Sequence, residues 1–250
     1  MTTVAPRRRS HESSEAWKAF GREDPTLHTA YEALADAAWQ GGGLSAVTKQ
    51  LLLVAAVGTA SEPDRNALQA QVRNALEAGA SRAQVREVLA VASILGVHSC
   101  IIGTPILLDE MVKLGLAKPD ATRPETVQIR EEFMDRRGYW SDLWEAVAAF
   151  DPQFLRAYLD YSSIPGERAV LDAQVRELVL IVLSSVTTHL FPDGLRVHVR
   201  GALSVGVPPD HIMQTFELLA AHGVRSVVDG YGLAELTQPH HSPPVSDSQS

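Results

Sequence analysis

The chain has 250 residues, of which 45% are hydrophobic and 21% are charged, so disorder of the whole chain is excluded. A formal net charge of −8 at pH 7 argues against binding to nucleic acid, which requires clustered positive charge. The single cysteine, Cys100, excludes both an intrachain disulfide and a dithiol redox pair.

The N-terminal residues 1–16 are polar and are predicted to form a disordered tail. They include the basic run 7–9, but no apolar stretch follows it, so export is not supported. The longest apolar run, residues 178–186, is shorter than the roughly 20 residues that cross a bilayer. We therefore expect a cytoplasmic protein with no membrane or nucleic-acid partner.

The remainder of the chain contains an internal sequence repeat. Residues 17–34, WKAFGREDPTLHTAYEAL, are echoed 127 positions later by WEAVAAFDPQFLRAYLDY at 144–161, and QVRNALEAGA at 71–80 is echoed by HVRGALSVGV at 198–207. A repeat this long indicates a duplicated domain. We predict a degenerate first repeat (17–117), a linker and connecting helix (118–143), a second repeat with the active site (144–236) and a disordered tail (237–250).

Glycine and proline punctuate both repeats, and no two-residue alternation favours strands, so the predicted fold class is all-α. The Pro-rich segment 118–128 leads into a helix near Glu125. In the second repeat the predicted helices cover 154–161, 171–187, 195–206, 208–222 and 224–236. The first repeat follows the same plan.

Ionisable residues distinguish the second repeat from the first at four matched positions. The first repeat has Gln50, Gln71, Ala90 and Leu95 where the second has Glu177, His198, Glu217 and His222. Glutamate and histidine exchange protons near neutrality, whereas glutamine, alanine and leucine do not. The comparison predicts one working site, in the second repeat.

Glu177 and His198 are the candidate catalytic pair. Their helices follow one another across a short turn and should pack antiparallel, which allows both side chains to face one groove. A carboxylate near an imidazole fixes its tautomer and raises its pKa, which suits proton transfer. The alternative is that Glu177 is a helix first-turn charge and His198 a half-buried structural histidine.

Other polar residues around the pair are candidates with supporting roles. Glu217 and His222 lie five residues apart and do not share one helix face, and the turn residues His189 and Asp193 could instead be solvated. Arg176 or Arg200 could bind a substrate carboxylate, or form surface ion pairs. No metal site is expected from the histidine spacing, and no Gly-rich phosphate loop indicates a cofactor.

The segment RELVLIVLSSV followed by LRVHVRGALSVGVPPDHI resembles the core of the carboxymuconolactone decarboxylase family. The matching positions of that pattern are Arg176, Glu177, His198, Ala202, Leu203, Gly206, Val207 and Gly223. The resemblance implies a helical bundle of the alkylhydroperoxidase D-like type that assembles into oligomers. The family's peroxidase branch uses Cys-x-x-Cys-x-x-x-His, but Phe191 and Gly194 occupy the two cysteine positions, so thiol peroxidase chemistry is not expected.

The resemblance implies a cofactor-independent acid/base enzyme, a carbon–carbon lyase that acts on a small lactone, an enol or an acid derived from an aromatic compound. Alternatives that use the same pair are an isomerase, a lactone hydrolase or a cyclase. A non-catalytic assembly or ligand-sensing protein is a third interpretation. The duplication predicts a homotrimer, with a homodimer as the alternative.

Overall fold

The computed structural model describes residues 12, 14–59, 64–138 and 140–236, so most of both predicted tails lies outside the described residues. All regular elements in the described ranges are helical, which confirms the all-α fold class. They are α1 (Glu15–Glu23), α2 (Pro25–Gln40), α3 (Ala46–Val57), α4 (Arg65–Glu77), α5 (Arg82–Ser93), η1 (Ile94–Val97), α6 (His98–Lys113), α7 (Pro124–Arg137), η2 (Asp142–Trp144), α8 (Glu145–Phe150), α9 (Pro152–Arg168), α10 (Ala173–Ser185), α11 (Pro192–Ser204), α12 (Pro209–His222) and α13 (Arg225–Leu236).

The helix boundaries recur at the spacing of the sequence repeat. Helices α2 to α6 correspond in order to α9 to α13, and α4 and α11 have the same length. The starts recur because the capping residues recur. Asp24 and Asp151 each precede a proline, and their side chains accept hydrogen bonds from the backbone N–H groups of Leu27 and Phe154.

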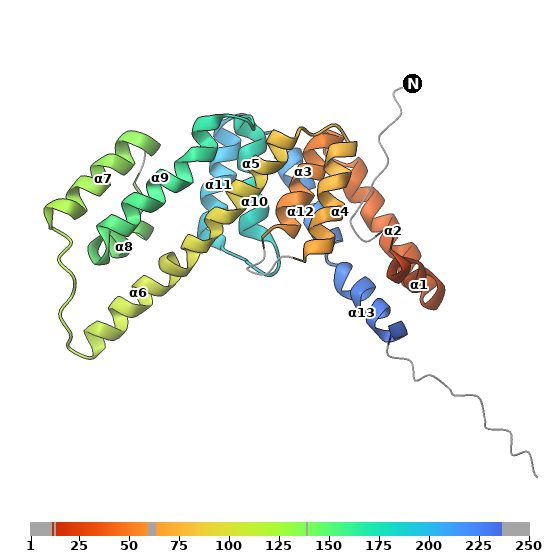
Figure 1. The fold of residues 1–250 in the computed structure, drawn as a ribbon, viewed down its shortest axis with the longest axis horizontal. Coiled ribbons are helices and arrows are strands. Elements are labelled where there is room, and N and C mark those ends of the chain that lie inside the picture. The colour runs from red at the N-terminus through yellow and green to blue at the C-terminus, as the bar shows by residue number, and fades with distance from the viewer. Residues whose placement is uncertain (1–11, 13, 60–63, 139, 237–250) are drawn as a thin grey trace, which may run out of the picture.

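Helices α3 and α10 form the centre of the molecule and pack against each other (Figure 1). Helix α3 buries every side chain from Lys49 to Val57, and α10 buries most side chains between Leu178 and Ser184. A helix that is apolar on all sides is stable only when other helices surround it. Helices α4, α5, α11 and α12 provide that cover, so both repeats share one core.

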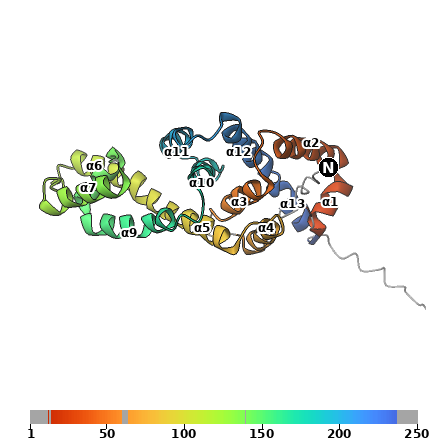
Figure 2. The ribbon, with the colours of Figure 1, turned by 90° about the horizontal axis from the view of Figure 1, so that it is seen from above.

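The first helices of each repeat pack on the other repeat. Helices α1 and α2 lie against α13 and α12, whereas α8 and α9 lie against α6 and α5 (Figure 2). Two smaller apolar clusters seal these contacts, one around Trp17 and Phe20, the other around Trp144 and Leu155. Each end of the molecule is therefore built from both repeats.

Two predicted boundaries are wrong. The helix predicted from residue 195 begins at Pro192, since proline fits the first turn of a helix. The helix predicted to cover 154–161 continues to Arg168 as α9. Ser162, Ser163 and Pro165 are buried, and this packing outweighs the local helix-breaking tendency of proline. The longer α9 brings Gly166 beside Arg176 of α10.

The connecting helix α7 has no counterpart among the described residues that precede α1. Its Ile129 and Phe133 complete the apolar cluster with α8 and α9, and the Thr126 hydroxyl donates to the carbonyl oxygen of Ala148 at 3.2 Å. The connection between the repeats is thus a packed part of the second repeat's end.

The continuous helical stretch Arg82–Lys113 is long and apolar enough to cross a membrane, by length and composition only. Its first part, α5, buries Val85, Val88 and Val91 in the shared core. Its last part, α6, leaves several apolar side chains exposed, namely Ile102, Ile106, Leu107 and Val112. One such stretch is weak evidence for a membrane protein, because apolar core helices pass the same test.

Candidate active site

Glu177 and His198 meet between α10 and α11. The Nδ1 atom of His198 lies 3.3 Å from the Oε2 atom of Glu177, and the side chains are 24% and 21% exposed. Gly201 permits this approach, because a Cβ atom at that position would lie 2.7 Å from Glu177 Oε2. The pair therefore combines a carboxylate–imidazole contact with access from solvent, as proton transfer to a substrate requires.

The first repeat holds a sealed counterpart of this pair. The side-chain amide of Gln71 donates a hydrogen bond to the Oε1 atom of Gln50, and each residue is only 1% exposed. The two amides keep the contact between the helices, but they cannot exchange protons near neutrality and no substrate reaches them.

A second pair of ionisable residues lies near Glu177 and His198. His98, at the start of α6, and His189, in the loop before α11, stack at 4.8 Å between ring centroids with 15° between the planes. Their Nδ1 and Nε2 atoms are 2.5 Å apart, and the ring of Phe191 lies 4.5 Å from that of His98. A residue of the first repeat thus contacts the loop that leads into the His198 helix.

Burial lowers the pKa of His98 from its usual 6.5 to about 4, with smaller contributions from His189 and His198. The contribution from His198 places the stacked pair within electrostatic range of the candidate catalytic pair. The imidazole of His98 is therefore neutral at pH 7 and can hydrogen-bond His189 without adding charge to the site.

The stability of the protein is expected to fall as the pH drops from about 6.5 to about 4. In that window the unfolded chain protonates His98 while the folded protein does not, so protonation favours unfolding. We expect the protonation of His98 to lower the free energy of unfolding by about 1–2 kcal/mol, after allowance for partial solvent screening. Urea unfolding at several pH values should show a smaller loss for His98→Gln, and an equal loss in both proteins would contradict the assignment.

The structure separates Glu217 from the candidate pair. Its Oε2 atom lies 3.3 Å from where a Cβ would stand at Gly41, beside the turn between α2 and α3. His222 ends α12, next to α13, which packs on α1. Asp193 is exposed in the first turn of α11. Of the predicted supporting residues, His189 is the one with a described contact to another histidine.

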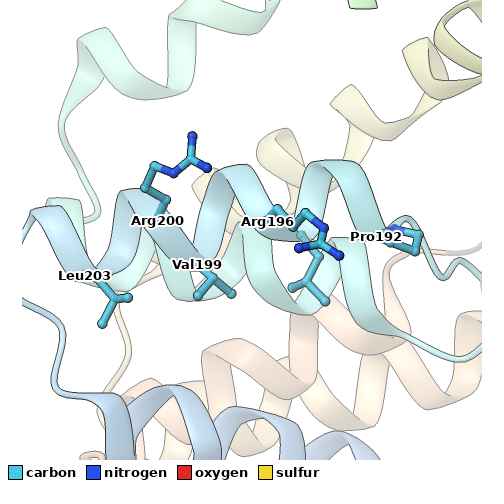
Figure 3. A pocket seen from close by; sticks show the side chains of 6 residues that line it. Pro192, Arg196, Val199, Arg200 and Leu203 are labelled. Carbon is cyan, nitrogen blue, oxygen red and sulfur yellow. The ribbon is translucent and has the colours of Figure 1, made fainter.

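The two arginines lie in different places. The Nη1 atom of Arg176 donates to the carbonyl oxygen of Gly166 at 3.4 Å, next to Glu177 on α10. Arg200 lines an open recess of about 560 Å³ on α11 together with Arg196 and the apolar Val199 and Leu203 (Figure 3). Residues two apart on a helix point about 200° apart, so Arg200 faces away from His198.

Glu87 and His98 were not among the predicted site residues, because both belong to the first repeat and the prediction rested on ionisable residues that only the second repeat has. The same alignment in the opposite direction finds both, since Glu87 corresponds to Gln214 and His98 to Arg225. Arg225 forms an ion pair with Asp64 at 2.7 Å at the first repeat's end. The two ends of the molecule therefore differ in residues from both repeats.

No group of three or more His, Cys, Asp or Glu side chains in the described part of the chain is placed to hold a metal ion. The chemistry available to the described site is that of carboxylates, imidazoles and guanidinium groups. The expectation that the protein needs no cofactor stays a prediction.

Comparison with known proteins agrees with this architecture. The sequence profile of the carboxymuconolactone decarboxylase family matches residues 25–97, which lie in the first repeat. A crystal structure from Burkholderia xenovorans LB400, of a protein proposed to be a gamma-carboxymuconolactone decarboxylase subunit, superposes with a TM-score of 0.84 at 29% identity. The similarity covers 91% of this chain and 92% of that one. A search of curated proteins gave no significant match.

The profile match and the whole-length structural similarity have independent bases, one in sequence and the other in the arrangement of helices. Both point to the family that the Arg176-Glu177 and His198 motifs suggested. The chain is therefore similar to the carboxymuconolactone decarboxylase family, in sequence over residues 25–97 and in fold over most of its length.

Proposed function

We propose that the protein is an acid/base enzyme of carboxymuconolactone decarboxylase type that acts on a small unsaturated lactone acid or a related acid derived from an aromatic compound. The observation that carries the proposal is the contrast between the two matched pairs. Glu177 and His198 are partly exposed, whereas Gln50 and Gln71 are sealed. A solvent-accessible carboxylate–imidazole pair on a bundle of this family supports a proton-transfer role.

In a decarboxylation the bond between the ring carbon and the carboxyl carbon breaks, carbon dioxide leaves, and the electron pair remains on the substrate as a dienolate. His198 then donates a proton to the dienolate carbon and is reprotonated from water. Because Glu177 contacts Nδ1, the transferred proton would be carried on Nε2. Glu177 stabilises the imidazolium that precedes transfer.

The test is turnover of a panel of unsaturated lactone acids by the wild type and by His198→Ala. Loss of the proton donor should lower kcat by about 10² to 10⁴-fold on any acid that the wild type converts. Gln71→Ala is the matched control in the first repeat and should keep the rate per folded molecule. Equal activity of wild type and His198→Ala would overturn the assignment of His198.

The assembly and location of the protein are also proposals. We propose a homotrimer in the cytoplasm, with a homodimer as the alternative; light scattering distinguishes the two. Proteins of this family are typically soluble. The fused repeats would then supply two related positions of one ring.

A further inference from the structure

The turn that ends α2 and the turn that ends α9 occupy matched positions, but their side chains differ. In the first repeat the Lys49 ammonium donates to the carbonyl oxygen of Trp39 and lies 5.1 Å from the centroid of the Trp39 ring. Both residues are buried, at 7% and 4% exposure. The indole thus fills the space over the cation.

In the second repeat Gly166 stands where the first has Trp39, and Arg176 stands where the first has Lys49. Arg176 still donates to the carbonyl oxygen of residue 166, so the local arrangement is kept. A Cβ atom at Gly166 would meet the Nη1 atom of Arg176 at 3.7 Å and no other side chain within 4 Å. A side chain at position 166 that pointed as the Trp39 indole does would therefore lie over the half-buried guanidinium of Arg176.

Glu87, a buried carboxylate of the first repeat, lies within electrostatic range of Arg176. Its counterpart in the second repeat is Gln214, which is fully hydrogen-bonded to the α2–α3 turn. Gln214 accepts from the N–H of Leu44 at 2.9 Å and donates to the carbonyl oxygens of Ala38 and Trp39 at 3.1 and 3.2 Å. Glu87 is 3% exposed, and its Oε1 atom has no hydrogen-bond partner.

The electrostatic surroundings of Glu87 agree with this placement. Burial raises the pKa of its carboxyl group, while the positive charges of Arg168, at the end of α9, and Arg176 oppose that rise. Both arginines flank the α9–α10 turn. Nearby positive charge stabilises a buried carboxylate, so Glu87 in turn helps to hold Arg176 at this turn.

We propose that the space beside Gly166 is a subsite for a flat, unsaturated ring. The ring stacks on the guanidinium of Arg176, as the indole of Trp39 covers Lys49. Arg176 directly precedes Glu177 on α10, so the subsite adjoins the catalytic pair. That the ring belongs to the substrate rests on the function proposed above, whereas the subsite itself does not.

Indole is the appropriate probe, because Trp39 presents the same group over Lys49 at the matched position. Titration of the full-length protein, followed by NMR or calorimetry, should show saturable binding to the wild type. Gly166→Trp should abolish that binding by filling the space covalently. Arg176→Leu should weaken it by about fivefold or more, because it removes the cation under the ring.

Gly166→Trp is expected to fold, since Gly166 is exposed at the end of a helix and loses backbone freedom on folding that other residues do not. Circular dichroism checks this, and Gly166→Leu replaces it if the tryptophan variant does not fold. The subsite is overturned if the wild type does not bind indole. It is also overturned if the folded Gly166 variant binds indole as tightly as the wild type does. Indole binding without turnover of any lactone acid supports the subsite and contradicts the proposed function. Turnover without indole binding supports the proposed function and contradicts the subsite.

Discussion

Replacing Glu177 and His198 together by glutamine is expected to abolish turnover while leaving the protein folded. The first repeat already carries Gln50 and Gln71 in this contact, hydrogen-bonded between the equivalent helices, so the fold accepts the amide pair. Amides cannot donate or remove protons near pH 7, and the rate should fall by at least about 10³-fold. The measurements are the rate on a lactone acid that the wild type converts and the midpoint of thermal unfolding.

The matched control changes the first repeat. Gln50→Leu with Gln71→Leu removes a buried amide pair and replaces both partners by apolar groups, so the effect should be on stability or assembly and not on the rate per folded molecule. If this variant loses activity without unfolding, while the Glu177 and His198 variant keeps it, the working site lies in the first repeat.

Ile181→Ala is expected to destabilise the whole molecule by about 3–4 kcal/mol, the usual cost of a large cavity in a tight core. Ile181 is fully buried on α10, in the cluster shared with α3. Because the repeats share that core, unfolding should be one transition, seen together by circular dichroism and by tryptophan fluorescence. Both probes should report the same midpoint in urea.

Leu190→Ala is the control, because Leu190 is 68% exposed and its loss should change the unfolding free energy by less than about 0.5 kcal/mol. Two separate transitions would show that the repeats fold as independent units and would contradict the shared core.

Local sequence signals predicted most of the helices. Asp-Pro pairs mark the starts of α2 and α9, and the glycines at 79 and 206 adopt the positive φ angles of +103° and +82° that follow a helix end. Periodicity shows which helix face is apolar, but not which helix covers it. The packing of α1 and α2 on the second repeat, and of α8 and α9 on the first, therefore could not be derived from the sequence.

Of the contacts in the candidate site, the sequence predicted only those between helices that follow one another in the chain. Glu177 and His198 belong to consecutive helices, and a short connection sufficed to place them together. His98 and Glu87 reach the same end from the other repeat, and Glu217 turns toward Gly41 because α12 packs on α2. These placements depend on long-range packing.

The exchanged packing also makes the two repeats depend on each other. The first repeat has glutamines where the second has Glu177 and His198, yet it supplies His98 and Glu87 to the other end of the molecule. A substitution in the first repeat can therefore change the surroundings of residues in the second. The two halves form one structural unit, and the surroundings of the candidate site depend on residues from both.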